Sequence, residues 1–276
     1  MPSLRPKPVL VLGTDDIASA VGHALASVGV AVLLARDPEV PVLRRGMSFD
    51  DALERGSVRV DGVTAYAASP PPLFPADGVL AVTALPIHKL MNPALIEGVI
   101  DARMRRGQHK PDLRGDLGFA IGLGPGFIAG TNVDIAVETA PDAAGLVLRE
   151  GATSPAHAVP PGEAGGRRLA RAPRSGIWWT FRDVGELVED GAVVGLCAGL
   201  QVPAPLAGHL SGLVRRGTEM RAGMRLLEVD PRGSDARCHG ISPWAATVAA
   251  GSLAALHELW RSPRRPARQE VIRWLI

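Results

Sequence analysis

Two kinds of hydrophobic pattern divide the chain. In the first half, short continuous apolar runs such as residues 9–12 and 30–34 alternate with stretches in which apolar residues recur every three or four positions. A continuous run of this length is typical of a strand buried on both faces of a parallel sheet. Between these two runs, four apolar residues share one face of a predicted helix: Ile17, Val21, Leu25 and Val28. This β-α-β order indicates an α/β fold that opens as a doubly wound parallel sheet.

The same two patterns predict the later elements. We expect strands at 79–84, 119–123, 133–137 and 146–149, a hairpin at 58–66, and helices at 49–55, 95–106 and 243–260. The hairpin is indicated by Asp61-Gly62, a pair that favours a tight turn between two strands.

In the second half, residues 172–195 and 204–227 are two copies of one pattern, offset by 32 positions. Each copy opens on Ala-Pro and keeps its glycines at the same spacing: Gly176, Gly185 and Gly191 match Gly208, Gly217 and Gly223. A copy this short cannot bury a core alone, so the two must interlock. We therefore expect a small pseudo-twofold β-domain.

Composition limits the class of protein. A hydrophobic fraction of 46% and a net charge of +2 are typical of a globular chain and not of a disordered one. No stretch approaches the roughly 20 apolar residues that span a bilayer, and no secretory signal is visible, so we expect a cytoplasmic protein without membrane contact. The basic residues are interrupted, which argues against nucleic acid as a partner. Cys197 and Cys238 are too few for a disulfide framework and lack the spacing of a zinc site, so no metal is expected.

The turn after the first predicted strand departs from the dinucleotide-binding pattern. That fingerprint needs Gly-x-Gly-x-x-Gly so that the backbone can approach a pyrophosphate. Here Gly13 is followed by Asp15 at the position of the second glycine, and a carboxylate repels phosphate. Asp15 or Asp16 is expected to cap the following helix. Ordinary NAD binding is therefore disfavoured, although Arg36 after the second strand could meet a 2′-phosphate.

A second turn, residues 122–130, is richer in glycine. Backbone amides around such glycines can form a concavity that binds anions. The turn follows a predicted strand, at the carboxyl end where open α/β sheets bind ligands; a tight structural turn is the alternative. Asn132 and Glu138 could line the same edge. The candidate cofactor-binding residues are Gly13, Asp16, Gly122, Gly124, Gly126, Phe127, Gly130, Asn132 and Glu138, and no catalytic residue is assigned.

The duplicated segment resembles the biotinyl/lipoyl type of barrel. In carriers of that type, a lysine sits on the hairpin between the two halves. Here that hairpin, residues 195–203, has no lysine, and the chain has none after Lys110. Biotin and lipoate are attached to an amine, so covalent biotin or lipoate is excluded and the barrel is expected to bind, brace or dock. Cys197 in the hairpin is expected to be a small buried hydrophobe.

Several segments together resemble one family, the YqeB-type accessory proteins of the selenium-dependent molybdenum hydroxylase system, which are related to XdhC-like maturation factors. The segments keep their order along the chain, and they are 119–130, 134–139, 161–166, 172–177, 223–226 and 229–233. The resemblance implies a Rossmann-like first domain and a role in maturing a molybdenum hydroxylase, by handling its pterin cofactor. The chain departs from the family pattern at Asp15 and at 140–142, where the family carries Gly-His-Asn. The second departure suggests a subgroup that serves a different partner.

These observations predict four regions. They are a Rossmann-like domain at 1–140, a connector rich in Gly and Pro at 141–171, a duplicated biotinyl/lipoyl-like β-barrel at 172–232, and a C-terminal helix and tail at 233–276. The expected function is maturation without turnover of its own: the protein would transiently bind a molybdopterin-type cofactor and present it to the apo-enzyme of a molybdenum hydroxylase.

Two alternatives remain open. One is an NAD(P)-binding oxidoreductase with a degenerate turn, in which His88 is the best available base. The other is a non-catalytic scaffold that contacts a partner through the barrel and the pair Trp178-Trp179. Association with further copies of the same chain is also open.

Overall fold

The computed structural model describes residues 7–68, 79–105, 107–115, 117–155 and 167–261, which form two compact units. Unit 1 combines the described residues of Met1–Asp37, Phe49–His157 and Ile241–Ile276, and unit 2 those of Pro38–Ser48 and Ala158–Gly240. Parts of the predicted connector and tail, 156–166 and 262–276, lie outside the described residues. The association of Pro38–Ser48 with unit 2 was not indicated by any local pattern, and the four predicted domain ranges stay a prediction.

Unit 1 is built on a nine-stranded sheet in the order β10-β9-β7-β6-β1-β2-β5-β4-β3. Its strands are β1 (Val9–Leu12), β2 (Val32–Ala35), β3 (Ser57–Val60), β4 (Val63–Ala67), β5 (Leu80–Thr83), β6 (Gly98–Asp101), β7 (Ala120–Leu123), β9 (Ile135–Val137) and β10 (Val147–Leu148). Neighbours from β9 to β4 are parallel, whereas β10 and β3 pair antiparallel at the two edges. A separate antiparallel ladder joins β8 (Ile128–Ala129) to β11 (Gly151–Ala152).

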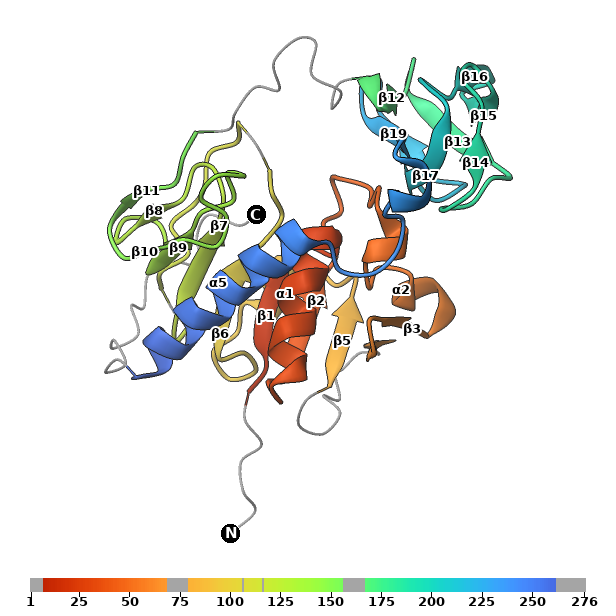
Figure 1. Ribbon diagram of the computed structural model, residues 1–276. Helices are drawn as coiled ribbons and strands as arrows, with labels where there is room; N and C mark the ends of the chain where they lie inside the picture. Colours follow the sequence, from red (N-terminus) through yellow and green to blue (C-terminus); the bar gives the residue numbers. More distant parts are fainter. Residues whose placement is uncertain (1–6, 69–78, 106, 116, 156–166, 262–276) are drawn as a thin grey trace. The chain divides into compact units, whose positions relative to one another are not determined.

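Helix α1 (Asp16–Ser27) follows β1, as predicted. Asp15 caps it, because its carboxylate accepts a hydrogen bond from the Ala18 N–H at 3.0 Å and so satisfies one free amide of the first turn. The second long helix, α5 (Pro243–Arg261), lies beside α1 on the same face of the sheet (Figure 1). A short helix, α2 (Ala52–Arg55), follows β2. No helix among the described residues is long and apolar enough to cross a bilayer.

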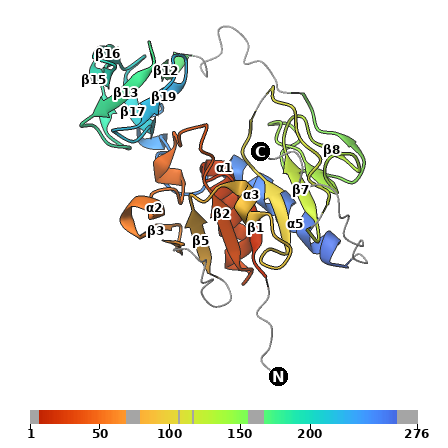
Figure 2. The same cartoon turned by 180° about the vertical axis from the view of Figure 1, so that it is seen from behind.

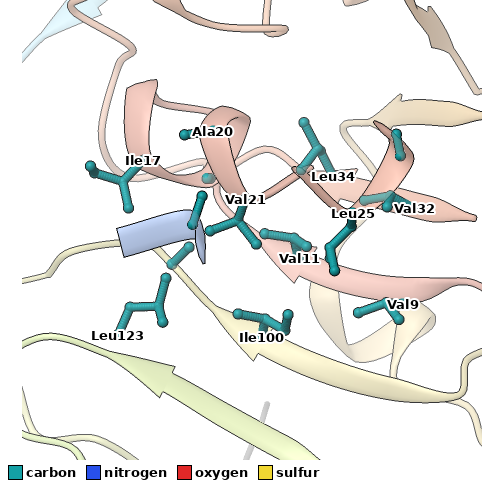
Figure 3. Packing of buried hydrophobic residues seen from close by; sticks show 14 of the residues in the cluster. Val9, Val11, Ile17, Ala20, Val21, Leu25, Val32, Leu34, Ile100 and Leu123 are labelled. Atoms are coloured by element: carbon teal, nitrogen blue, oxygen red, sulfur yellow. The ribbon is translucent and has the colours of Figure 1, made fainter. Parts of the chain in front are cut away.

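Both faces of the central strands are buried, because alternate residues of a strand point to opposite faces. Val9 and Val11 of β1 pack in the cluster that includes residues of α1 and α5 (Figure 3). Leu10 and Leu12 pack in a second cluster, on the opposite face of the sheet. That face is covered by the short helix α3 (Ile87–Leu90) and by connections that contribute Leu113, Leu117 and Phe127.

The predicted doubly wound parallel sheet is wrong. The sheet is mixed, since an antiparallel strand closes each edge, and its second face is covered mainly by irregular connections instead of crossover helices. The helix predicted at 95–106 is instead β6, a central strand whose four residues are all buried. The pair Val99-Ile100 is β-branched, and such residues favour a strand once β1 and β7 supply hydrogen-bond partners on both sides.

Unit 2 consists of two four-stranded antiparallel sheets, ordered β12-β19-β17-β14 and β16-β15-β13-β18. The strands are β12 (Leu169–Arg171), β13 (Gly176–Thr180), β14 (Leu187–Val188), β15 (Val193–Cys197), β16 (Leu200–Pro203), β17 (Gly208–Leu213), β18 (Glu219–Met220) and β19 (Arg225–Asp230). The core of the unit contains Trp178, whose indole N–H donates to the Val214 carbonyl at 3.0 Å. Two short 3-10 helices, η1 (Arg45–Met47) and η2 (Gly233–Asp235), also belong to this unit.

The duplicated pattern is repeated in the backbone of unit 2. Gly176 and Gly208 have φ values of 148° and 150°. The matching later glycines also have positive φ: Gly185, Gly217, Gly191 and Gly223. Strand β13 of the first copy pairs with β18 of the second, and β17 of the second pairs with β14 of the first. The predicted interlocking of the two copies is therefore confirmed.

The predicted small biotinyl/lipoyl-like barrel is wrong, because the strands of unit 2 divide between two sheets that no described strand pair joins. The strands that exchange between the copies, β14 and β18, have two residues each. Ladders this short, bounded by glycine turns, do not continue from one sheet into the other.

Candidate functional site

The glycine turn at residues 122–130 follows β7, at the carboxyl edge of the parallel part of the unit 1 sheet (Figure 2). The ends of β1, β2 and β6 lie on the same edge, because these strands are parallel and adjacent to one another. This edge is where open α/β sheets bind ligands. The two predicted turns, at Gly13 and at 122–130, lie at the ends of β1 and β7, and β6 is the one strand between them.

Two glycines of the second turn make room for neighbouring side chains. A Cβ added to Gly122 would lie 2.2 Å from the ring of Phe127, which is fully buried. A Cβ on Gly126 would lie 3.1 Å from Cγ of Lys110, and Gly126 has φ +91°. Gly124 has φ +78°, and its N–H donates to the Val137 carbonyl at 3.0 Å. The glycine pattern therefore serves internal packing, and at Gly126 it also shapes an exposed part of the turn.

Two polar side chains brace this turn, the predicted Asn132 and Thr153, which the sequence did not indicate. Asn132 accepts a hydrogen bond from the Ile128 N–H at 2.8 Å and donates to the Gly126 carbonyl at 3.0 Å. Thr153 Oγ1 donates to the Gly124 carbonyl at 2.6 Å. Gly130, at φ +76°, closes the turn by donating its N–H to the Val133 carbonyl at 2.8 Å, and a Cβ added there would meet no atom within 4 Å. These bonds fix the turn before any ligand arrives.

Glu138 lies behind the turn and is committed to the backbone. Its Oε1 accepts from the N–H groups of Thr139 and Ala140 at 2.7 and 2.9 Å, and its Oε2 accepts from the Ser154 N–H at 2.6 Å. Burial raises the pKa of this carboxyl, but the hydrogen bonds from Ser154 and Ala140 outweigh burial and hold the pKa below its ordinary value. Glu138 is therefore an ionised brace of the site in this structure.

The first turn carries carboxylates at the end of β1. Gly13 has φ +111°, and its N–H donates to the Ala35 carbonyl at 2.8 Å. Asp16 is the first residue of α1 and is half-buried. Burial, and then the charge of Asp16, raise the pKa of Asp15 to about 7. Arg36 is held by Asp50 at 2.8 Å, so it does not stand ready for a 2′-phosphate, and the NAD(P) alternative gains no support here.

Three basic residues that the sequence did not single out gather near the second turn; we call Arg103, Arg105 and Lys110 the cation cluster. Met104 between the two arginines has φ +50°, an unusual conformation for a bulky side chain. On one side of Met104, Arg103 forms an ion pair with Asp101 at 2.6 Å. On the other side, Arg105 Nε donates a hydrogen bond to the Asp37 carboxylate at 2.7 Å.

Lys110 is the third member of the cation cluster. Lys110 is 6% exposed to solvent. Its ammonium lies 4.8 Å from the centroid of the Phe127 ring, which is a cation–π distance. Burial lowers the pKa of Lys110 and the nearby Arg103 and Arg105 lower it further, against the opposing effect of Asp101. The sequence held one signal for it: Lys110 is one of three lysines in a chain whose other basic residues are arginines.

The remaining predicted functional residues lie on other elements. His88 is exposed on α3. Cys197 is buried in unit 2, where burial raises the pKa of its thiol. Trp178 is fully buried and Trp179 is 54% exposed, so they point to opposite faces of β13, as their adjacency predicted. Among the described residues, no three His, Cys, Asp or Glu side chains are grouped so that they could hold a metal ion.

Comparison with known proteins gives a relationship to one bacterial protein. No family model matches the chain. "Uncharacterized protein YqeB" of Escherichia coli (strain K12) is 30% identical over 255 residues, which cover 90% of this chain and 47% of that protein. The chain thus spans about half the length of this curated relative.

Two solved structures align with low scores. The apo structure of the ectoine utilization protein EutE (DoeB) from Ruegeria pomeroyi has 12% identity and a TM-score of 0.26, over 82% of this chain and 87% of that one. A succinylglutamatedesuccinylase/aspartoacylase from Rhodobacter sphaeroides has 15% identity and the same TM-score, over 82% and 86%. What the comparisons support is similarity to a YqeB protein over most of this chain, while a role in selenium or molybdenum metabolism stays a prediction.

Proposed function

We propose that this protein is an accessory factor for a molybdenum hydroxylase, and that it binds the molybdopterin-type cofactor at the carboxyl edge of the unit 1 sheet and presents it to the apo-enzyme. The resemblance of six segments to the YqeB-type accessory proteins motivates the proposal, and the similarity to the Escherichia coli YqeB protein is in keeping with it. The name of that relative assigns no activity.

The observation that carries the proposal is the braced turn at 122–130. Its backbone is held in place by the side chains of Asn132 and Thr153, and Gly126 at its tip is exposed, with the aliphatic stem of Lys110 beside it. The cation cluster lies next to it. A fixed turn with open backbone and nearby positive charge favours an anionic, phosphate-bearing ligand.

Unit 2 fits a supporting role in this proposal. No lysine is present in its sequence, so it has no amine that could carry biotin or lipoate covalently. Its exposed apolar side chains include Trp179 and Phe181, which is 94% exposed. Unit 2 would contact the apo-enzyme.

The test is retention of the cofactor. The protein is purified without metal or cofactor added, small molecules are released by denaturation, and pterin derivatives are identified by mass spectrometry. We expect a pterin phosphate from the wild type and none from Gly126→Asp, which adds a side chain and a negative charge at the tip of the turn.

Gly62→Asp is the matched control, because Gly62 also has a positive φ and lies in the exposed β3–β4 turn of the same unit. It should retain the pterin. Equal retention in both variants would exclude this site, and absence of pterin from the wild type isolated from cells that make the cofactor would refute the proposed function.

A further inference from the structure

We propose that Lys110 is an anion-binding residue, and that its ammonium holds a phosphate group at the carboxyl edge of the unit 1 sheet. The inference deepens the proposed function and rests on it for the identity of the ligand, a phosphate-bearing pterin. The glycine pattern and the family resemblance give this lysine no role.

The first argument is that Lys110 is buried without a partner. No described residue accepts a hydrogen bond from its ammonium or forms an ion pair with it. The interaction recorded for the ammonium is the cation–π contact with the Phe127 ring. Among the described side-chain nitrogens, Arg168 Nε and Trp244 Nε1 have neither a hydrogen-bond acceptor nor contact with solvent. Lys110 Nζ also lacks an acceptor but does not belong to this group, so it keeps some contact with solvent. An unpaired cation in a largely buried position is unfavourable, and a bound anion would relieve that penalty.

The second argument is the local balance of charge. Asp101 accepts two hydrogen bonds from the guanidinium of Arg103, and Asp37 accepts two from that of Arg105. Both carboxylates are buried, and they are the acidic groups whose charges act on Lys110. Each acid is therefore matched by its own arginine, and Lys110 is the cation left over. A phosphate group supplies the missing negative charge and several acceptor oxygens.

The third argument is that the lysine stem is held in place. The stem of Lys110 packs beside Gly126, where a Cβ added to the glycine would lie 3.1 Å from Lys110 Cγ. The Phe127 ring beside the ammonium packs in turn on Gly122. A cation whose stem is fixed loses little conformational freedom when it binds a ligand. Lysine suits this position because its charge is compact and reaches a phosphate as a point charge.

The direct test uses the small number of lysines. With lysine labelled biosynthetically at Cε and Nζ, the full chain should give three lysine signals in a nuclear magnetic resonance spectrum, from Lys7, Lys89 and Lys110. Inorganic phosphate is the probe, titrated at constant ionic strength. We expect the Lys110 signal, identified by its absence in Lys110→Met, to move and saturate, while the signals of Lys7 and Lys89 follow the small shifts produced by chloride.

A second measurement separates a binding role from a structural one. Lys110→Met keeps a side chain of similar length and removes the unpaired charge. Its Tm without phosphate should equal or exceed that of the wild type, because binding residues are often unfavourable for stability. Phosphate should raise the Tm of the wild type and of Lys89→Met, and should bind about tenfold or more weakly to Lys110→Met, the loss expected for one charge-assisted hydrogen bond.

Three results would overturn the inference: a Lys110 signal that does not respond to phosphate, equal phosphate binding by Lys110→Met and the wild type, or a lowered Tm of Lys110→Met combined with an unchanged response to phosphate. The proposed function fails separately, when the wild type releases no pterin. A Lys110 signal that responds to phosphate in that case supports the phosphate site and assigns it to another phosphate-bearing ligand.

Discussion

Replacing Asp15 with asparagine tests whether the negative charge of ionised Asp15 lowers the free energy of unfolding. Asp15 caps α1 through its hydrogen bond to Ala18 N–H, and asparagine caps a helix about as well as aspartate. The substitution therefore keeps the cap and removes the titrating group. The pKa of Asp15 rises to about 7, first because it is buried and second because Asp16 lies beside it.

The sign of the effect follows from the direction of this shift. The folded state holds the proton of Asp15 up to about pH 7, whereas the unfolded chain loses it near the ordinary value of 3.8. Between these values the folded state binds more protons, so the wild type loses free energy of unfolding as the pH rises. A shift of one pKa unit corresponds to about 1.4 kcal/mol. Since the Asp15 side chain keeps some solvent contact, we expect Asp15→Asn to gain on the order of 2 kcal/mol over the wild type between pH 5 and pH 8.

The assay is urea unfolding of both proteins at pH 5 and pH 8, followed by the helical circular-dichroism signal. The two long helices of the described chain, α1 and α5, both belong to unit 1, so this signal reports the unit that contains Asp15. Asp142→Asn, an exposed carboxylate of the same unit, is the control and should show no pH-dependent gain. A stability difference between Asp15→Asn and the wild type that stays constant from pH 5 to pH 8 would refute the reasoning.

Three further predictions concern packing. Trp178→Ala should lower the free energy of unfolding by about 3–5 kcal/mol, because the indole is fully buried and hydrogen-bonded. Trp179→Ala on the outer face should lower it by about 1 kcal/mol or less. Equal losses of the two variants in urea unfolding would contradict this difference in burial. Gly122→Ala should cost about 1–3 kcal/mol, since its Cβ would overlap the ring of Phe127, and an unchanged Tm would show that the ring moves freely. Cys197 should react with a thiol reagent at pH 8 only after unfolding, because the thiol is enclosed and burial raises its pKa; rapid labelling of the folded protein would count against this.

The parts of the fold that local patterns determine could be predicted from the sequence. Strand β1, the capped helix α1 and strand β2 follow from a buried run, a helical stripe and a second run. The hairpin at Asp61-Gly62 follows from its turn residues, and it forms β3 and β4. These signals lie within a few residues of one another, so no distant partner is needed to read them.

The order of the strands could not be predicted, because it depends on partners far away in the chain. The stretch 95–106 satisfies a helical stripe and a buried strand equally well, and its position between β1 and β7 decides for the strand β6. In unit 2 the repeated glycines indicated two interlocking copies. Whether the copies close into a barrel depends on ladder lengths that spacing alone does not reveal.

The candidate site shows the same division between local and distant signals. The glycines of the second turn are visible in the sequence, which leaves open amides and a tight structural turn as alternatives, but the sequence does not show that Gly122 and Gly126 make room for Phe127 and Lys110. Lys110 precedes this turn by more than ten residues, in a connection without periodicity. Its burial and lack of a partner appear only when the connection folds over the sheet edge.

The two turns at this edge differ in charge, and we expect that difference to decide where an anion binds. At the end of β1, Asp15 and Asp16 stand where a dinucleotide fold would expose bare backbone, and negative charge there, on Asp16 and above about pH 7 also on Asp15, repels phosphate. Near the end of β7, the cation cluster contains one positive charge that its carboxylates do not match. We therefore expect a phosphate-bearing ligand to avoid the first turn and to bind at the second, beside Lys110.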